Sequence, residues 1–232
     1  MTYQVEFRAY SPVSAFGPAT SALSSEQAPS VAGPLTSRQA RLKRAADLLL
    51  ATLALLVAVP LCCLAAIAIR LDTRGPVLFI QMRRGLDGRP FRIWKLRTML
   101  GSDESRDAGA ALPDAHRITR VGRWLRSLSL DELPQLWNVL RGEMSLVGPR
   151  PHALHHDASY DRLVADYSSR RCVLPGLTGW AQVNGLCGPA PHLPAMIARV
   201  EHDLWYARNW SLRLDLVILA RTLPCLFRPR AC

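Results

Sequence analysis

The sequence has few acidic residues and few cysteines, of which only Cys62 and Cys63 are adjacent. Its 232 residues include 18 Asp and Glu against 29 Lys and Arg, which gives a formal net charge of +11. This surplus indicates an anionic partner, and nucleic acid, anionic lipid and a phosphorylated substrate all fit it. The six cysteines include no CxxC pair, which argues against a zinc site or a disulfide framework, so we expect reduced thiols and a cytoplasmic domain.

The first part of the chain carries little charge and has no helical period. Residues 1–40 are rich in Ser, Ala and Pro, and they lack the basic-then-apolar order of a signal peptide. Such a composition cannot bury enough apolar surface to order itself. We therefore expect a disordered N-terminal tail at residues 1–40, and we expect residues 224–232 to form a C-terminal tail.

One long apolar run is present, from Ala45 to Ile69, with basic residues on both sides. As a helix it is long enough to cross a bilayer. Pro60 would kink that helix, and basic residues at both ends conflict with a simple crossing because they prefer the cytoplasmic side. A re-entrant helix at residues 41–74, which enters and leaves on one face, satisfies both facts. A membrane-spanning anchor with a kink is the alternative, and the residues alone leave both open.

Two short strand-like runs follow, at Val77–Gln81 and Phe91–Lys95. The turn residues between them favour a β-hairpin. Lys95 and Arg97 at the end of the second run either face nucleotide or membrane phosphates or belong to a solvated basic edge strand. Residues 101–113 are small and polar and predict a loop.

Arginines then recur at every third position. They are Arg117, Arg120, Arg123 and Arg126, and Trp124 lies among the apolar residues between them. This pattern predicts an amphipathic basic helix of the kind that lies in a membrane surface. Nucleic acid is an alternative ligand for these arginines, but Trp124 and the apolar run favour the membrane.

Two adjacent carboxylates, Asp131 and Glu132, stand at the start of a predicted short helix. Ser129 precedes Glu132 at the spacing of a capping box. Taken alone, an Asp-Glu pair at a helix start more often caps the helix than catalyses a reaction. Arg126 before the pair and Arg150 between two prolines change this interpretation, because such a cluster favours a phosphate-bearing substrate. The predicted chemistry is attack of a carboxylate on phosphorus, with arginines and Mg²⁺ neutralising the charge.

The run from Ser129 to Pro151, SLDELPQLWNVLRGEMSLVGPRP, resembles the signature of the bacterial sugar transferases, which are polyprenyl-phosphate phosphoglycosyl transferases with one membrane helix. The resemblance implies that Asp131 is the nucleophile. It would attack the β-phosphate of a UDP-sugar, release UMP and hold the phosphosugar until undecaprenyl phosphate takes it. The resemblance also implies that Glu132 completes the dyad, that Arg126 and Arg150 bind phosphate, and that Mg²⁺ bridges Asp131 and the pyrophosphate.

The resemblance covers about residues 43–223 and so includes the membrane segment and a later loop. It implies a helix broken at Pro60. The residues that match the positions where family chains enter the membrane are Lys43, Arg44 and Asp47. It further implies that three polar or aromatic residues of the loop lie on the substrate side, whereas the residues alone also fit a loop packed on the core; they are Trp180, Gln182 and Asn184. This loop is most similar to that of the undecaprenyl-phosphate glucose phosphotransferases, so glucose is the favoured sugar, followed by galactose.

Three histidines, His152, His155 and His156, have a spacing that could suit a metal ion. No nearby cysteine completes such a site. We expect these histidines on a helix surface.

The whole chain is thus predicted to be a monotopic membrane enzyme, mainly α-helical with short β-hairpin elements and a proline-broken re-entrant helix. Residues 75–223 would form a catalytic domain on the cytoplasmic face of a bacterial inner membrane. We expect transfer of a sugar-1-phosphate from a UDP-sugar to undecaprenyl phosphate, the first step of exopolysaccharide or other surface-glycan synthesis, with membrane lipids as partners and no nucleic acid. The alternatives are a membrane-surface phosphohydrolase and a non-catalytic basic protein that binds lipid or nucleic acid.

Overall fold

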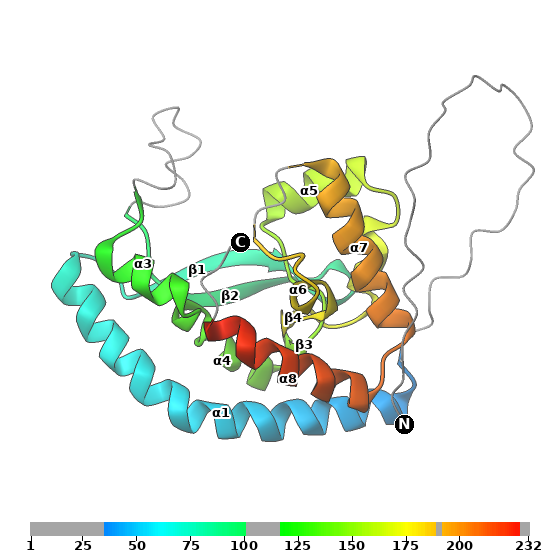
Figure 1. The fold of residues 1–232 in the computed structure, drawn as a ribbon, viewed down its shortest axis with the longest axis horizontal. Helices are drawn as coiled ribbons and strands as arrows, with labels where there is room; N and C mark the ends of the chain where they lie inside the picture. The colour runs from blue at the N-terminus through cyan, green and yellow to red at the C-terminus, as the bar shows by residue number, and fades with distance from the viewer. Residues whose placement is uncertain (1–34, 101–116, 189–191, 228–232) are drawn as a thin grey trace, which may run out of the picture. The chain divides into compact units, whose positions relative to one another are not determined.

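The computed structural model describes three stretches of the chain, residues 35–100, 117–188 and 192–227. They are mainly helical, with two small two-stranded sheets (Figure 1). The prediction of a mainly α-helical fold with short β elements is therefore confirmed. The predictions for residues 1–34, for the loop at 101–113 and for residues 228–232 lie outside the described residues.

The long apolar run forms one helix, α1 (Ser37–Asp72), which starts within the stretch expected to be a tail. Thr36 caps its first turn, because its hydroxyl accepts a hydrogen bond from the backbone N–H of Gln39. Pro60 lies inside the helix and does not end it, although a proline removes one backbone hydrogen bond. Figure 1 shows α1 as one curved, uninterrupted helix, so the re-entrant break stays a prediction.

Helix α1 buries one narrow stripe along its length and exposes its other faces. The buried residues recur at intervals of four or seven, and they are Lys43, Asp47, Ala51, Ala58, Ala65 and Ile69. Large apolar side chains are exposed elsewhere on the helix, among them Leu49, Leu56 and Leu71. In the described part of the chain, α1 is the one helix long and apolar enough to cross a membrane, by length and composition. Its exposed surface is the kind that a helix presents to lipid.

The predicted β-hairpin is confirmed as strands β1 (Leu78–Arg84) and β2 (Pro90–Leu96), which a short 3-10 turn, η1 (Leu86–Gly88), joins. The antiparallel register pairs Phe79 with Lys95. Because side chains alternate along a strand, residues 79, 81 and 83 share a face with Lys95.

The predicted basic helix is α3 (Arg120–Ser127), and it packs closely on the chain that follows the hairpin. Thr119 caps it by accepting a hydrogen bond from the backbone N–H of Gly122 at 2.8 Å. A Cβ at Gly122 would lie 2.1 Å from the carbonyl oxygen of Thr98, so a larger residue would force the two segments apart. Trp124 is 63% exposed, and its insertion into a membrane surface stays a prediction.

A second sheet holds the chain that leads to Arg150. Strand β3 (Ser145–Val147) pairs in parallel with β4 (Gly176–Thr178). A Cβ on Gly176 would lie 2.1 Å from the backbone nitrogen of Gly148. The glycines therefore allow the two backbone segments to approach each other closely.

Seven further elements complete the described fold, and α8 continues past residue 223, where the catalytic domain was expected to end. They are η3 (Leu130–Glu132), α4 (Gln135–Arg141), α5 (Leu154–Leu163), η4 (Tyr167–Cys172), α6 (Trp180–Val183), α7 (Leu193–Arg208) and α8 (Leu212–Phe227). The main core joins Ala51 and Ala58 of α1 to buried side chains of β2, α4, β3, α7 and α8. The long apolar helix is therefore a part of this core.

Among the described cysteines, one departs from the expectation of reduced thiols. Cys187 is disulfide-bonded, whereas Cys62, Cys63 and Cys172 are free. Spacing along the sequence could not show this, because a disulfide depends on the distance between two residues in the fold.

Candidate active site

The Asp131–Glu132 pair stands on the single turn η3, between α3 and α4. Ser129 precedes the turn in the left-handed conformation, with φ 58°, and makes no capping hydrogen bond there. The predicted capping box is therefore wrong, and α4 begins after Pro134. Each carboxylate residue is only 7% exposed. The turn thus presents two largely buried carboxylates whose oxygens do not cap a helix.

Glu132 is held by two cations. Nη1 of Arg150 donates to Oε2 of Glu132 at 3.0 Å, and Nη2 donates to Oε1. Nζ of Lys95 donates to the same Oε1 at 3.1 Å. Burial alone would raise the pKa of Glu132, but Arg150 and Lys95 outweigh it and hold this pKa well below its usual range. Glu132 is therefore ionised and fixed in position.

Asp131 has a different environment from its neighbour. Its Oδ1 is buried and has no hydrogen-bond partner among the described residues. Burial raises the pKa of Asp131, and the adjacent charge of Glu132 raises it further, although nearby cations oppose both effects. One carboxylate is thus fully engaged, and the other keeps an unengaged oxygen, which is the arrangement expected when two carboxylates have different tasks.

A groove of about 860 Å³ opens beside Asp131. It extends along β1 and the end of β2, and its polar and charged lining includes Arg74, Gln81, Arg83, Lys95, Arg97, Thr98, Arg117, Arg126, Asp131 and His156. Arg126 forms no ion pair within the described part of the chain, so its charge is available to a ligand. The structure therefore brings four predicted site residues to one groove, and Glu132 and Arg150 adjoin it through Lys95.

Arg97 is engaged with the end of α1. Its Nη2 donates to the carbonyl and hydroxyl oxygens of Thr73, both at 2.8 Å, and its Nη1 donates to the carbonyl of Arg74 at 2.8 Å. These contacts fix the turn that connects α1 to β1. Its predicted phosphate contact stays a prediction, and its Nε is buried without a partner among the described residues.

The structure does not place the predicted loop residues at this groove. Trp180 stacks on Trp205 with ring centroids 5.0 Å apart, and Asn184 donates to the carbonyl of Trp180 at 2.8 Å. Gln182 donates through Nε2 to the carbonyl of Leu177 at 3.4 Å. These polar contacts therefore stay within α6 and its neighbours. These contacts belong to the packing of the loop. The contact of the three residues with substrate stays a prediction.

The backbone of Arg150 is held by residues that the sequence did not indicate. Nη2 of Arg170 donates to the carbonyl oxygen of Arg150 at 2.8 Å and to Oδ2 of Asp203 at 2.5 Å. Arg170 and Asp203 are almost fully buried, with side chains 4% and 2% exposed. Their separation in the sequence leaves no local pattern that could have identified them.

His152 also belongs to this supporting network and is not a surface histidine. Its Nδ1 lies 2.6 Å from the hydroxyl of Tyr167, which donates to Oδ1 of Asp157 at 2.8 Å. Burial and the charge of Arg170 hold the pKa of His152 well below its ordinary value, so the ring is neutral. The expectation of a helix-surface position is wrong for His152, which precedes α5 and is half-buried, and it is confirmed for His155 and His156, which are exposed on α5.

The residues expected where the chain enters the membrane attach α1 to the domain. Nζ of Lys43 donates to Oδ2 of Asp215 at 2.7 Å and to the carbonyl of Val147 at 3.0 Å. Arg44 donates to carbonyl oxygens at the end of α4. Oδ1 of Asp47 accepts the backbone N–H of Leu146 at 3.0 Å. These contacts hold α1 against β3, the strand that leads to Arg150.

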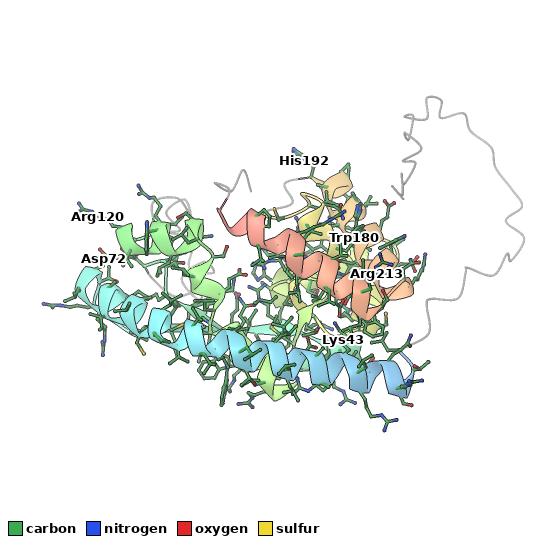
Figure 2. All side chains as sticks on the ribbon, turned by 60° about the horizontal axis from the view of Figure 1, so that its bottom comes forward. Lys43, Asp72, Arg120, Trp180, His192 and Arg213 are labelled. Atoms are coloured by element: carbon green, nitrogen blue, oxygen red, sulfur yellow. The ribbon has the colours of Figure 1, made fainter. Side chains whose placement is uncertain are left out.

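The opposite end of α1 is attached as well. Oδ2 of Asp72 accepts the backbone N–H of Val121 at 3.2 Å, and Figure 2 shows Lys43 and Asp72 toward opposite ends of α1, with Asp72 near Arg120 of α3. The two ends of the apolar helix thus contact the same folded unit.

The residues around Asp131 fit a magnesium ion. Protein sites for Mg²⁺ usually supply one or two carboxylates and leave the remaining positions to water and substrate phosphates. Asp131 offers a buried carboxylate oxygen without a hydrogen-bond partner, next to a groove rich in phosphate-binding side chains. Asp131 alone offers too few ligands for Mg²⁺, so water and substrate phosphates would have to complete the coordination.

Comparisons with known proteins identify the family of the chain. The model of the bacterial sugar transferase family matches residues 38–229. The chain is 47% identical over 189 residues to the UDP-glucose:undecaprenyl-phosphate glucose-1-phosphate transferase of Escherichia coli K12, an alignment that covers 82% of the chain and 41% of that protein. A protein of the same name from Caulobacter vibrioides is 50% identical over 184 residues, which is 79% of the chain and 69% of that protein.

A relative with a different sugar is nearly as similar. The UDP-N-acetylgalactosamine-undecaprenyl-phosphate N-acetylgalactosaminephosphotransferase of Aeromonas hydrophila is 42% identical over 182 residues, which is 78% of the chain and 43% of that protein. The chain therefore spans about two fifths of the Escherichia and Aeromonas relatives, and the site described above lies within the shared part.

Proposed function

The chain belongs to the bacterial sugar transferase family, and from this we propose that it transfers a sugar-1-phosphate from a UDP-sugar to undecaprenyl phosphate. Glucose-1-phosphate is the favoured group because the two relatives with the higher identity are named for it, and galactose is the second choice. The reaction would be the first membrane step of exopolysaccharide or other surface-glycan synthesis.

The observation that carries the proposal is the difference between the two carboxylates. Glu132 is fully engaged by Arg150 and Lys95, whereas Oδ1 of Asp131 has no hydrogen-bond partner among the described residues. A nucleophile needs an unengaged oxygen, and a positioning group needs fixed partners. Asp131 therefore suits attack on phosphorus, and Glu132 suits the orientation of Lys95 and Arg150.

In the first half-reaction, a carboxylate oxygen of Asp131 attacks the β-phosphorus of the donor. The bond from the β-phosphorus to the oxygen that bridges the two phosphates breaks, and UMP leaves with that oxygen. Arg126 and Lys95 are placed to stabilise the charge on the transferring group because both line the groove beside Asp131. The product is an acyl phosphate that joins Asp131 to the phosphosugar.

In the second half-reaction, an oxygen of the acceptor's phosphate attacks the same phosphorus. The acyl phosphate bond breaks, the carboxylate of Asp131 is restored, and a pyrophosphate-linked lipid leaves. Bound Mg²⁺, held through Asp131, would supply charge neutralisation for the phosphates. Every group that the chain contributes returns to its starting state, so one Asp131 serves both halves.

We propose a monotopic arrangement at the cytoplasmic face of the bacterial inner membrane, and the attachment of α1 supports the monotopic part of this proposal. Lys43 and Asp72 lie toward opposite ends of the helix, and both contact the folded domain. A straight crossing would separate these two ends by the hydrocarbon layer, which is about 30 Å thick. A helix that enters and leaves on one face, bent near Pro60, keeps both contacts on the same side.

A donor panel tests the proposed function. Purified protein, Mg²⁺ and undecaprenyl phosphate are incubated with UDP-glucose, UDP-galactose and their N-acetyl forms, and UMP and lipid-soluble label are measured. We expect UMP release with UDP-glucose and equal labelling of the lipid. Release of a sugar phosphate into water would indicate a phosphohydrolase, and salt-dependent binding without UMP from any donor would indicate a non-catalytic basic protein.

A further inference from the structure

The groove beside Asp131 has an apolar side that the transfer chemistry does not use. Leu78, Ile80 and Met82 on β1 are 40%, 46% and 38% exposed, and all three line the groove. Phe79 and Met99 add to this lining. A row of exposed aliphatic side chains on a short strand is a liability in water, since such surfaces favour association. The row is therefore expected to have an apolar ligand.

This row continues into the surface of the membrane helix. Leu78 pairs with Leu96 in the hairpin register. Leu96 is buried in a cluster with Ala65 and Ile69 of α1. Leu71, in the last turn of α1, is 84% exposed. The apolar side of the groove thus begins beside the helix that faces lipid.

The charge of the groove selects among apolar ligands. Among the described residues, its lining contains one carboxylate, that of Asp131, against six cationic side chains, which are Arg74, Arg83, Lys95, Arg97, Arg117 and Arg126. The apolar row lies on the opposite face of β1 from Lys95, so it borders the cationic lining at the edge of the hairpin. An apolar row beside cationic side chains complements a molecule that has one phosphate and a long hydrocarbon chain. A nucleotide sugar has no apolar chain to cover three aliphatic residues.

We propose that Leu78, Ile80 and Met82 bind the first apolar segment of the acceptor, a long-chain prenyl phosphate, between its phosphate at Asp131 and the bilayer. This inference rests on the proposed function and adds the position of the acceptor chain. Covering the row removes apolar surface from water only when the acceptor is bound. The row therefore contributes to acceptor affinity and leaves donor binding unaffected.

The test separates the two half-reactions. Leu78→Ser, Ile80→Ser and Met82→Ser variants, singly and combined, are compared with Leu163→Ser, which alters a 61% exposed leucine on α5 outside the groove lining. The first half-reaction is measured without acceptor, as exchange of labelled UMP into UDP-sugar. The second is measured as the KM for undecaprenyl phosphate. Flotation with vesicles of phosphatidylglycerol and phosphatidylethanolamine reports membrane binding.

We expect the combined variant to exchange UMP at the wild-type rate and to raise the acceptor KM about ten-fold, with Leu163→Ser unchanged in both. An unchanged acceptor KM would overturn the inference, and so would a loss of vesicle binding with an unchanged KM, because the row would then be a surface for bulk lipid. A parallel loss of exchange would also overturn it. If the wild-type protein itself exchanges no UMP with any UDP-sugar, the proposed function fails instead.

Discussion

Arg150 donates hydrogen bonds to Glu132 from both terminal nitrogens of its guanidinium, and the distance from Nη1 to Oε2 is 3.0 Å. Such a bidentate ion pair holds the guanidinium and the carboxylate in one plane. The carboxylate of Glu132 therefore orients Arg150 and Lys95, and it leaves Asp131 as the carboxylate that can react.

Replacing Asp131 by Asn should abolish UMP release and leave membrane binding intact. The amide cannot form the acyl phosphate, and the hydrogen bonds that attach α1 to the domain do not involve Asp131. UMP release and vesicle flotation measure the two effects, with Asp166→Asn as the control because Asp166 is exposed and its left-handed conformation tolerates Asn. Mass spectrometry of donor-treated wild-type enzyme without acceptor should find the phosphosugar on the peptide with Asp131. Turnover by Asp131→Asn would contradict the nucleophile role.

Replacing Glu132 by Gln should reduce kcat by about a hundred-fold. The neutral amide keeps the shape of the side chain but loses the charge that orients Arg150 and Lys95. Steady-state UMP release gives kcat, and Glu201→Gln, on an exposed residue of α7, is the matched control. Wild-type kcat in Glu132→Gln would show that Arg150 needs no ionised partner.

The pH profile should reflect the raised pKa of Asp131. Burial and Glu132 raise this pKa above the ordinary 3.8, so the ionised nucleophile is lost as the pH falls through a higher value than that of an exposed Asp. The acid limb of kcat/KM for UMP release measures it. Arg126 opposes the shift, so Arg126→Gln should move the limb to higher pH, and Arg123→Gln should not. If the acid limb of kcat/KM stays at the same pH in Arg126→Gln, the group that titrates there is not Asp131.

Replacing Arg170 by Ala should destabilise the fold by about 3–5 kcal/mol, because it leaves Asp203 as a buried, unpaired charge. Thermal unfolding in detergent measures this, with the exposed Arg162→Ala as control. The double variant Arg170→Met with Asp203→Leu should recover most of the stability and still reduce kcat, since the carbonyl of Arg150 loses its donor. Full activity in that double variant would limit the pair to a structural role.

Single cysteines at the two ends of α1 should react from the same side of the membrane. Arg41→Cys and Arg74→Cys, in a variant without the native free thiols, are treated with a membrane-impermeant maleimide on inside-out vesicles. Both should be labelled, because both ends of α1 contact the same domain. Labelling of only one of them on inside-out vesicles and of the other on right-side-out vesicles would indicate a spanning helix.

Sequence reasoning found the parts of the site that are close together along the chain. Asp131, Glu132, Arg126 and Arg150 lie within one short stretch, and their types alone indicated phosphate chemistry. Arg170 and Asp203 could not be found this way, because only the fold brings them to Arg150.

Local patterns also misled where a competing interaction was stronger. Ser129 has the spacing of a capping residue, but it takes a left-handed conformation while Glu132 pairs with Arg150 and Lys95. The position of Lys43 where the chain enters the membrane stays a prediction, but its partner could not be found locally, because it is buried against Asp215, which is 172 residues away. A propensity for a local role gives way when a buried charge needs a partner.

Because alanines of α1 are part of the core, we expect that deleting this helix does not give a folded, soluble enzyme. Ala51 and Ala58 are part of the main core, and Lys43 neutralises a carboxylate inside it. A truncated protein that starts after Asp72 would leave Asp215 without its cation and would open the core to water. The proposed lipid anchor and the folded core thus share residues, and we expect detergent or nanodiscs to be needed for any preparation that retains the native site.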